Sequence, residues 1–567
     1  LRLMKVSNKI SVQKTVEFCQ KQGVKDIVIS PGSRNAPFTI SFTNNPYFNC
    51  YSIVDERSAA YFALGIAQQK NKPVAIVSTS GTATLNYAPA IAEAHFQGIP
   101  LLVITADRQS NGLEIGDGQA INQKGIYSNF CENNYNLIED EKDELELNLA
   151  LIQEVFYGLI EKKKTVHLNV QLQEPLYDKI EIIPLEEEIK HQEMEPFQGI
   201  SEKSEELIHK WNTYSSKLIL VSQNNYENLQ PGLEKLLETD KNLVVLTETT
   251  GDIISDQFNS CIDRTIELIN KDNPEGFIPD LIVTIGHSVI SKKIKQLFRV
   301  HKPKEHWSFS EVRNENLFEM ETFEKRREEV EFLALISSKG IDENSKESFK
   351  IHWNSIEKES TEKHIQYLKQ TPFSDLKAFE IVLEKLPACN LQMGNSSVVR
   401  YIQLFNQRED IVYNGNRGVS GIEGCTSTAI GACVANHNSI LISGDVSFFY
   451  DSNAFWNNHV PANFKVIVIN NGEGNIFKIL PHPQKDEMSL PFFTTPHQTS
   501  IKKFCDLYSL NYLVANNKEN LEHKIKQLIN TNDRPAVLEV NTVGIKNDEI
   551  LKEYFQYLSH SEKSAFL

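Results

Sequence analysis

Short runs of aliphatic and β-branched residues, each closed by a turn rich in Gly, Asn or Asp, recur along the chain and constrain its fold more than any other feature. Between them lie stretches of helix-forming residues, for example residues 56–70. Strands that alternate with helices in this way form parallel sheets covered on both faces. The sequence therefore predicts an α/β protein with doubly wound parallel sheets. Its functional residues should lie in the turns after the strands, because ligands gather at the carboxyl ends of strands in open α/β sheets.

Three blocks of this pattern follow one another in the 567-residue chain, a length that suits about three to five domains. We expect a first domain at residues 1–184, a central domain at 185–370 and a third domain at 371–567. Residues 320–370 are dense in charge and low in strand propensity, so we expect solvated helices and a connector there. The strand candidates are residues 26–30, 74–80 and 101–107 in the first block, 216–223, 242–250 and 280–286 in the second, and the runs NLQMGNS, DIVYNGNRG, SILISGD, FKVIVINN and RPAVLEVNT in the third.

The charge balance and the missing signals exclude several classes of protein. The chain has 58 Lys and Arg against 75 Asp and Glu, a formal net charge of -17, which repels nucleic-acid backbones and anionic lipid. No apolar run reaches the length of a membrane span, and the first residues lack the apolar core of a secretory signal. The eight cysteines show no metal-ligand spacing, and neither a GxGxxG motif nor a P-loop is present. We therefore expect a cytoplasmic protein without nucleic-acid or membrane partners.

The most informative turns follow two strand candidates of the third block. One strand candidate ends in Gly444 and Asp445, and the next ends in Asn471. Asp and Asn at strand ends often only cap helices and shape turns. Hard oxygen donors at the ends of adjacent strands, however, suit Mg²⁺, which commonly keeps phosphate oxygens among its ligands. The main-chain amides of Val446 and Ser447 would face the same phosphate, so the two turns together predict a phosphate and metal site.

This pattern resembles the diphosphate-binding signature of thiamine-diphosphate enzymes, in which an Asp, the second of two Asn residues and a main-chain carbonyl hold the metal. The resemblance implies thiamine diphosphate as the cofactor, and Mg²⁺ or Mn²⁺ bound by Asp445, Asn471 and the carbonyl of Glu473. The common signature has Gly in place of Val446, and main-chain contacts would survive that change. The cofactor-binding residues that it implies are Glu56, Ser420, Gly421, Ile422, Gly444, Asp445, Val446, Ser447, Asn471 and Phe477.

A second element of thiamine-diphosphate enzymes is a carboxylate that bonds the aminopyrimidine ring and helps to activate the cofactor. Glu56, which follows a strand-like run and precedes an Ala-rich helix, matches this carboxylate. A glutamate in the first turn also stabilises a helix through the helix dipole. The small-residue turn within residues 74–94, however, is what these enzymes show after that glutamate. The resemblance therefore implies that Glu56 is the catalytic residue.

Further segments narrow the resemblance to one family. They are SPGSRNAPF (30–38), ITADRQ (104–109), GDGQAINQ (116–123), GNSSVVR (394–400) and NRGVSGIEG (416–424). Together with VDERSA and NNGEGNIFKILP, they are similar to the 2-succinyl-5-enolpyruvyl-6-hydroxy-3-cyclohexene-1-carboxylate synthase family of menaquinone biosynthesis. The resemblance extends over about residues 6–550 and is loose in the middle block. It implies a transferase that decarboxylates 2-oxoglutarate and adds the resulting succinyl carbanion in 1,4 fashion to isochorismate.

Both of these substrates are dianions, so the acidic chain must supply a local cationic site. An Arg side chain binds a carboxylate through two parallel hydrogen bonds, although for any single Arg a surface ion pair remains the alternative. The resemblance assigns Ser396, Arg400 and Arg417 to 2-oxoglutarate. It assigns Ser33, Arg34, Arg108, Gln119 and Lys292 to isochorismate, and it makes Phe477 and Leu480 the apolar wall beside the reacting centre.

The resemblance also implies a homodimer, or a dimer of dimers. In these enzymes the glutamate-bearing block of one subunit and the diphosphate-bearing block of another enclose one cofactor, whose bent shape Ile422 would hold. Two alternatives stay open. One is another thiamine-diphosphate-dependent decarboxylase or carboligase, similar to acetolactate synthase, which does not need the motif arginines. The other is a catalytically silent ligand-binding protein on the same fold.

Overall fold

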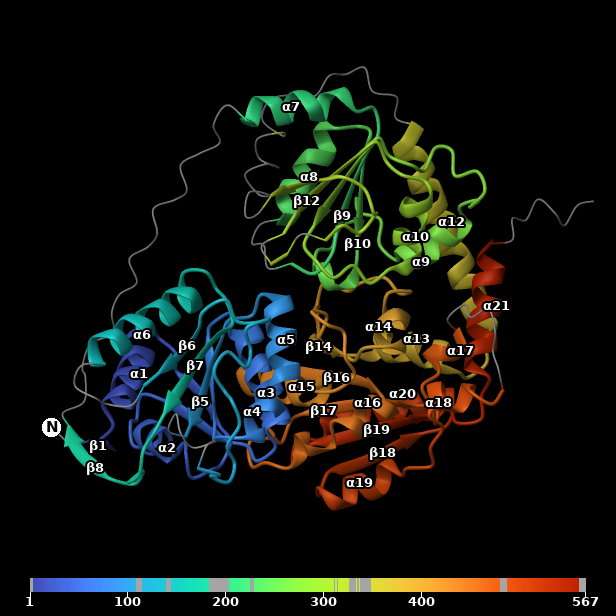
Figure 1. The fold of residues 1–567 in the computed structure, drawn as a ribbon. Coiled ribbons are helices and arrows are strands. Elements are labelled where there is room, and N and C mark those ends of the chain that lie inside the picture. Colours follow the sequence, from blue (N-terminus) through green and yellow to red (C-terminus); the bar gives the residue numbers. More distant parts are fainter. Residues whose placement is uncertain are drawn as a thin grey trace, which may run out of the picture.

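The computed structural model describes residues 4–108, 115–138, 144–182, 203–224, 229–310, 312–313, 315–325, 333, 336, 348–479 and 487–559. Three parallel sheets organise the chain. The first and third sheets, blue to cyan and orange to red in Figure 1, lie side by side, and the green middle sheet lies above them. This arrangement confirms the predicted class of doubly wound parallel sheets.

The first sheet has the strand order β3-β2-β4-β5-β7-β6, and all its strand pairs are parallel. Helices α1, α2 and α6 cover one face, and α3 and α5 cover the other. The strands are β2 (Asp26–Ile29), β3 (Asn49–Ser52), β4 (Val74–Ser78), β5 (Leu101–Asp107), β6 (Asn134–Leu137) and β7 (Val166–Gln171). The helices are α1 (Ile10–Lys21), α2 (Ala36–Thr43), α3 (Glu56–Lys70), α4 (Thr82–Asn86), α5 (Ala88–Gln97) and α6 (Leu145–Ile160).

The third sheet, β15-β14-β16-β17-β19-β18, repeats this order strand for strand, so the two sheets share one topology. Helices α13, α14, α20 and α21 cover one face, and α15, α16 and α19 pack on the other. The strands are β14 (Cys389–Met393), β15 (Ile411–Gly415), β16 (Ser439–Gly444), β17 (Lys465–Asn470), β18 (Asn511–Ala515) and β19 (Ala536–Asn541). The helices are α13 (Asp375–Lys385), α14 (Ser397–Ile402), α15 (Cys425–Ala435), α16 (Asp445–Tyr450), η3 (Ser452–Phe455), α17 (Ile476–Ile479), α18 (Leu490–Thr494), α19 (Ile501–Leu507), α20 (Lys518–Asn530) and α21 (Asn547–Ser559).

The middle sheet has the order β10-β9-β11-β12-β13. Helices α7 and α8 pack on one face, and α9, α10 and α12 pack on the other. Its strands are β9 (Lys217–Val221), β10 (Leu243–Thr247), β11 (Leu281–Ile285), β12 (Glu305–Phe309) and β13 (Thr322–Lys325). Its helices are α7 (Lys203–Thr213), α8 (Leu229–Thr239), η1 (Thr249–Gly251), α9 (Ile262–Thr265), η2 (Ile266–Leu268), α10 (Lys292–Val300) and α12 (Ser348–Gln370).

Two details differ from the sequence-based expectations. Within residues 320–370, α12 is the expected helix, but β13 is a strand that pairs parallel to β12. Thr322 and Phe323 favour a strand, but the charged residues around them hid this short signal. Outside the three sheets, β1 (Met4–Ser7) and β8 (Lys179–Ile182) form a small antiparallel pair that the sequence pattern did not indicate. The division into domains at 184/185 and 370/371 stays a prediction.

Helices α3 and α15 join the first and third sheets through one shared hydrophobic core. Their backbones approach so closely that a Cβ atom added at Gly65 would lie 2.0 Å from the carbonyl oxygen of Thr428. An added Cβ at Gly431 would lie 2.0 Å from the carbonyl oxygen of Phe62. Both glycines are therefore required by a close approach of backbone to backbone, and the two sheets are held as one unit.

A local signal fixes the start of α3. The side chain of Asp55, the N-cap residue, accepts a hydrogen bond from the main-chain N–H of Ser58 at 3.1 Å. An aspartate that accepts from the third residue of a helix satisfies one of its free amides. Glu56 thus becomes the first residue of α3, with its side chain half-buried.

In the part of the chain that the structure describes, none of the helices is both long and apolar enough to cross a membrane.

Candidate active site

The predicted site residues gather at the carboxyl ends of the three sheets. In each sheet the strand order reverses between two central strands, β2 and β4 in the first, β9 and β11 in the second, and β14 and β16 in the third. Ligands bind at such topological switch points because the turns diverge there and leave a crevice. The turns that the sequence singled out follow these strands or their neighbours.

Asp445 and Asn471 lie in adjacent turns of the third sheet, after β16 and β17. The buried Asp445 carboxylate accepts main-chain N–H groups from Val446 at 2.8 Å and from Gly472 at 2.7 Å. The Asn471 amide oxygen accepts the N–H of Glu473 at 3.3 Å. The three predicted metal ligands therefore lie in two turns that a hydrogen bond joins.

These turns fit a metal-bound diphosphate. A Cβ atom added at Gly444 would meet no atom within 4 Å, so the space over that turn is open. The described part of the chain contains no cluster of three or more His, Cys, Asp or Glu side chains placed to hold a metal. One carboxylate and two neutral oxygens leave coordination positions for phosphate oxygens, as Mg²⁺ sites commonly do. The donors and the open space are thus those that the predicted cofactor requires.

His497 lies at the same turns and was missed by the sequence analysis. Its Nε2 is 3.3 Å from a carboxylate oxygen of Asp445, and its main-chain N–H donates to the carbonyl of Gly472 at 2.9 Å. The Asp445 carboxylate raises the pKa of the His497 imidazole. His497 lies 26 positions after Asn471 with no motif around it, so no local signal could have found it.

The turn that carries Ser420, Gly421 and Ile422 is tied to its surroundings on both sides. The hydroxyl of Ser447 donates to the carbonyl of Ile422 at 2.6 Å. The Nδ2 of Asn395 donates to the carbonyl of Gly421 at 2.6 Å. Ser420 has a φ of 68°, a strained value for a residue other than glycine. The half-buried Ile422 is thereby fixed next to the turn that follows β16.

A buried carboxylate of the first block binds the main chain at the start of this turn. Glu93, on α5, accepts the main-chain N–H groups of Gly418 at 2.6 Å and Val419 at 2.8 Å. Burial raises the pKa of the Glu93 carboxyl. The first block therefore positions a turn of the third block through a group that no sequence motif marks.

Arg400 and Arg417 are two neighbouring cations at the end of the third sheet. Arg417 is 6% exposed, and it donates to Asn395 Oδ1 at 2.7 Å. Burial and the nearby Arg400 lower the pKa of the Arg417 guanidinium to about 10. The Nε of Arg417 is buried without a hydrogen-bond partner among the described residues. Two adjacent cations, one with an unused donor, form a site for an anion.

Ser396 is the residue from which α14 begins, and its backbone is strained. It is the N-cap residue, with φ 68° and ψ −118°. Arg400 donates back to the Ser396 carbonyl at 2.5 Å. Non-glycine residues hold such angles only where the surrounding structure fixes them, often at functional sites. The predicted 2-oxoglutarate residues Ser396, Arg400 and Arg417 are therefore brought together.

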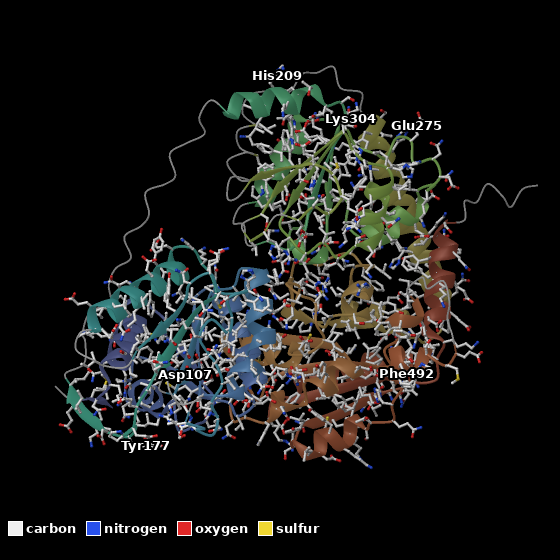
Figure 2. The ribbon with its side chains drawn as sticks, in the orientation of Figure 1. Asp107, Tyr177, His209, Glu275, Lys304 and Phe492 are labelled. Atoms are coloured by element: carbon white, nitrogen blue, oxygen red, sulfur yellow. The ribbon has the colours of Figure 1, made fainter. Side chains whose placement is uncertain are left out.

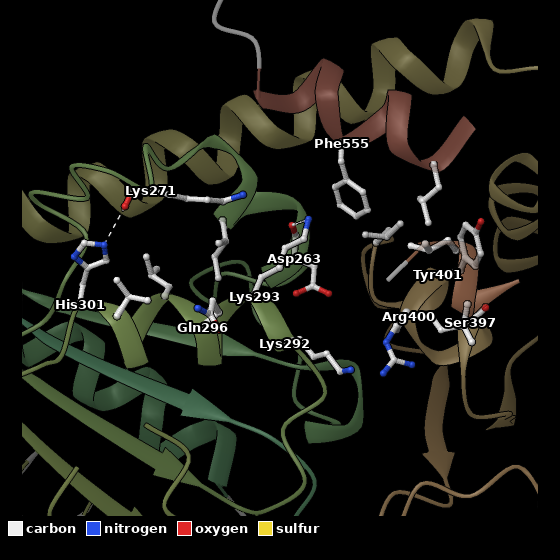
Figure 3. Close-up of a pocket in the computed structure, with 17 residues that line it drawn as sticks. Asp263, Lys271, Lys292, Lys293, Gln296, His301, Ser397, Arg400, Tyr401 and Phe555 are labelled. Carbon is white, nitrogen blue, oxygen red and sulfur yellow. Dashed lines mark hydrogen bonds between the residues drawn. The ribbon is translucent and has the colours of Figure 1, made fainter. Parts of the chain in front are cut away.

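Lys292 faces this group from the middle block. It is the first residue of α10 and is exposed. A cavity of about 640 Å³ lies between α10 and the helices α14 and α21, and both Lys292 and Arg400 line it. Figure 3 shows their side chains pointing toward each other at one end of this cavity. Lys292 thus lies across the cavity from Arg400, and its assignment to isochorismate stays a prediction.

The other predicted isochorismate residues lie at the end of the first sheet. Arg34 is 7% exposed and donates to the carbonyl of Leu172 at 2.8 Å. Asp107, at the end of β5 (Figure 2), accepts the N–H of Arg108 at 2.7 Å. Burial raises the pKa of the Asp107 carboxyl, and the positive charges of Arg34 and Arg108 oppose that rise. Ser33 and Gln119 are exposed in the turns beside them. Each arginine also lies 3.4 Å from an acid, Arg34 from Glu174 and Arg108 from Asp117, so the end of the first sheet carries two arginines that are paired with acids.

Glu56 follows β3 at the end of the first sheet, and its two neighbours contact helices of the third block. Arg57 donates to the carbonyl of Tyr450, the last residue of α16, at 2.7 Å, and Asn453 Nδ2, in η3, donates to Asp55 at 2.7 Å. No hydrogen bond or ion pair between described residues joins Glu56 to Asp445. Burial and the adjacent Asp55 raise the pKa of the Glu56 carboxyl.

The remaining predicted residues are the two assigned to the apolar wall, Phe477 and Leu480. Phe477, on α17, is 38% exposed and packs against Phe493 with ring centroids 6.0 Å apart. Leu480 lies outside the described residues. The roles assigned to all these residues stay predictions.

The comparisons with known proteins agree with the geometry. The family model described as the N-terminal TPP binding domain of thiamine pyrophosphate enzymes matches residues 12–126, and that of the C-terminal TPP binding domain matches residues 392–540. The curated 2-succinyl-5-enolpyruvyl-6-hydroxy-3-cyclohexene-1-carboxylate synthase of Flavobacterium psychrophilum is 43% identical, over 96% of this chain and 98% of the relative. Proteins of the same name from Flavobacterium johnsoniae and Christiangramia forsetii are 40% and 38% identical, over 96% and 98% of this chain and 98% and 100% of their own lengths.

Proposed function

The chain belongs to the 2-succinyl-5-enolpyruvyl-6-hydroxy-3-cyclohexene-1-carboxylate synthase family of thiamine-diphosphate-dependent enzymes, and we propose that it joins 2-oxoglutarate to isochorismate in menaquinone biosynthesis. In this reaction 2-oxoglutarate loses CO₂, and the remaining succinyl unit adds in 1,4 fashion to the isochorismate ring. The protein is thus a transferase and a decarboxylating carboligase.

Thiamine diphosphate supplies the stabilisation of the carbanion when it is bound, and the chain supplies binding, orientation and electrostatics. Asp445, Asn471 and the carbonyl of Glu473 would hold Mg²⁺ or Mn²⁺ together with the diphosphate. The open space over Gly444 supports this placement. Ile422, fixed by Ser447, would support the bent cofactor.

Glu56 would bind the aminopyrimidine ring and hold a proton at its carboxyl group. Burial raises the pKa of this carboxyl, which favours the protonated form that such a hydrogen bond uses. Among the described residues of one chain, no hydrogen bond or ion pair joins Glu56 to Asp445. We therefore infer a homodimer, or a dimer of dimers, in which Glu56 of one subunit completes the cofactor site of the other.

Exposed apolar side chains beside the cofactor turns support this assembly. Phe492, labelled in Figure 2, is 85% exposed, and Met488 is 82% exposed. Phe493, next to them in α18, packs against Phe477. Large exposed apolar patches mark interaction surfaces, so a second subunit would cover this region.

The adjacent Arg400 and Arg417 are the single observation that carries the substrate assignment. Burial lowers the pKa of both guanidinium groups, so a negatively charged ligand would stabilise them. Arg417 Nε has no partner among the described residues, which leaves a donor for a carboxylate. We assign the 2-oxoglutarate carboxylates to these arginines with Ser396, and isochorismate to the Arg34 and Arg108 group.

Lys292 would serve either substrate, because it faces Arg400 from across the cavity. The exposed Ser33 and Gln119 would line the isochorismate side, and Phe477 and Leu480 the apolar wall. The expected cytoplasmic location also belongs to this proposal, and cell fractionation would test it.

The decisive experiment follows isochorismate by its near-ultraviolet absorbance. Purified protein is mixed with thiamine diphosphate, Mg²⁺ and 2-oxoglutarate before isochorismate is added. We expect isochorismate to disappear only when all three additions are present. Release of CO₂ from 2-oxoglutarate or pyruvate with isochorismate untouched would instead indicate another decarboxylase or carboligase. Cofactor binding without any turnover would indicate a silent binding protein.

A further inference from the structure

Asp375 is a buried carboxylate behind the predicted metal ligand Asn471. It is the first residue of α13, and its exposed fraction is 1%. The helix start is fixed by Ser374, whose side chain accepts the N–H of Lys377 at 3.4 Å. No sequence motif marks Asp375, because its partners come from distant parts of the chain.

Each carboxylate oxygen of Asp375 accepts one side-chain donor. Oδ2 accepts from Asn471 Nδ2 at 2.9 Å, and Oδ1 accepts from Thr542 Oγ1 at 2.6 Å. The main-chain N–H of Asp375 donates to Asn547 Oδ1 at 2.8 Å. Two separate segments therefore hold the carboxylate and a third holds the main chain of Asp375, so the side chain has little freedom to move.

This contact decides which end of the Asn471 amide faces the metal site. An amide nitrogen only donates and an amide oxygen only accepts. Because Asp375 binds Nδ2, Oδ1 of Asn471 turns to the other side, where the N–H of Glu473 donates to it at 3.3 Å. A hard cation binds the oxygen and not the nitrogen of an amide.

We propose that Asp375 is a positioning residue that holds the Asn471 amide with its oxygen toward the bound divalent cation. This inference rests on the proposed function, because it takes Asn471 as a metal ligand. Outer partners that orient metal ligands contribute about 10- to 100-fold in metal affinity.

The first test measures Mn²⁺ binding by electron paramagnetic resonance, in the presence of thiamine diphosphate and without substrates. Asp375→Asn lets the new side chain donate to Asn471 and turn its amide around. We expect the Mn²⁺ affinity to fall by about 10- to 100-fold. Asp548→Asn, which changes a half-buried acid paired with Lys552, is the matched control and should leave the affinity unchanged.

A second test exchanges the two side chains, so that it does not depend on the folding of one variant. Asn471→Asp alone places two carboxylates face to face, and its Mn²⁺ affinity should fall. The double variant Asp375→Asn with Asn471→Asp restores a donor opposite an acceptor and keeps an oxygen ligand. It should bind Mn²⁺ at least about 10-fold more tightly than Asn471→Asp alone, by the same outer-partner contribution.

The results separate the two proposals. Equal affinities of Asn471→Asp and the double variant, or an unchanged affinity in a folded Asp375→Asn protein, would overturn the role of Asp375 while the cofactor site stands. If the unaltered protein binds no Mn²⁺ with thiamine diphosphate, the proposed function itself fails.

Discussion

The first and third sheets have the same strand order, but the turns that follow their central strands differ in packing and in charge. In the first sheet these turns pack closely against each other and against a neighbouring turn. A Cβ atom added at Gly32 would lie 2.2 Å from the Thr79 side chain, and one added at Gly81 would lie 2.9 Å from the Gln119 carbonyl oxygen. In the third sheet the equivalent turn at Gly444 faces open space. Identical topology thus leaves open space over the turn that follows β16 but not over the equivalent turn that follows β4.

The chemistry of the equivalent turns differs in the same way. The turn after β4 in the first sheet, residues 78–81, contains no charged residue. The equivalent turn after β16 in the third sheet contains Gly444 and the acidic Asp445. After the first strand, both sheets carry an arginine, Arg34 or Arg400. Topology therefore determines where a site lies, and the turn residues determine which ligand it binds.

The largest effect should come from Glu56→Gln, which removes a proton-holding group and keeps the size of the side chain. We expect turnover to fall by about 10²- to 10⁴-fold, the usual contribution of acid-base groups. Binding of thiamine diphosphate, measured by calorimetry, should persist, because the change leaves the proposed metal and diphosphate ligands in the Asp445 turns intact. Full turnover in this variant would contradict the role of the first sheet in catalysis.

Asp445→Ala tests the third sheet against Thr79→Ala at the equivalent turn of the first. Cofactor affinity should fall by more than about 100-fold, because a direct metal ligand contributes more than the outer partners that contribute about 10- to 100-fold. Thr79→Ala should leave cofactor binding intact. Calorimetry with thiamine diphosphate and Mg²⁺ will measure the affinity of both variants. An equal loss of cofactor affinity in the two would contradict the placement of the diphosphate site in the third sheet.

Arg34→Ala and Arg400→Ala test how the two sheets divide the substrates. Each change removes a charged hydrogen-bond donor, a loss of about 1.5 to 3 kcal/mol, or about 10- to 150-fold in affinity. We expect Arg34→Ala to raise the KM for isochorismate and Arg400→Ala to raise the KM for 2-oxoglutarate. Steady-state kinetics with each substrate varied will check this, and an exchange of the two effects would reverse the assignment.

Gly65→Ala should destabilise the joint between the two sheets. The added Cβ would lie 2.0 Å from the Thr428 carbonyl oxygen, and overpacking of this kind costs about 1 to 3 kcal/mol. Gly232→Ala is the matched control, because its Cβ would lie 3.6 Å from Leu333 and Ala favours the helix by about 1 kcal/mol. Denaturant unfolding should show a decrease for Gly65→Ala and an increase for Gly232→Ala.

The smallest effect concerns the pH dependence of stability at the start of α15. Asp451 accepts the N–H and the hydroxyl of Ser427, and burial raises its pKa from 3.8 to about 7. A carboxyl with a raised pKa stabilises the fold at low pH, and this contribution disappears as the pH rises from about 4 through 7. Asp451→Asn should flatten the fall in melting temperature over that range. An unchanged slope would exclude Asp451 as a source of it.

The strands and turns that could be predicted from the sequence are those whose own residues mark them. Gly444 with Asp445, and Asn471 after an apolar strand, mark strand ends locally, so the metal turns could be identified. Short edge strands such as β3 (NCYS) and β6 (NYNL) could not, because their residues favour a strand only when a neighbour pairs with them. The positions of Glu93 and Asp375 were equally out of reach, since each acts through partners far away in sequence.

The joint between α3 and α15 has a consequence for synthesis on the ribosome. At about 5 to 20 residues per second, the interval between Gly65 and Gly431 takes roughly 20 to 70 s to translate. During that time α3, whose residues Ser58–Ala67 are all buried in the finished fold, has no α15 to cover it. The nascent first block therefore exposes an apolar helix face for most of translation, and chaperones that bind such faces would bind this chain before its second half emerges.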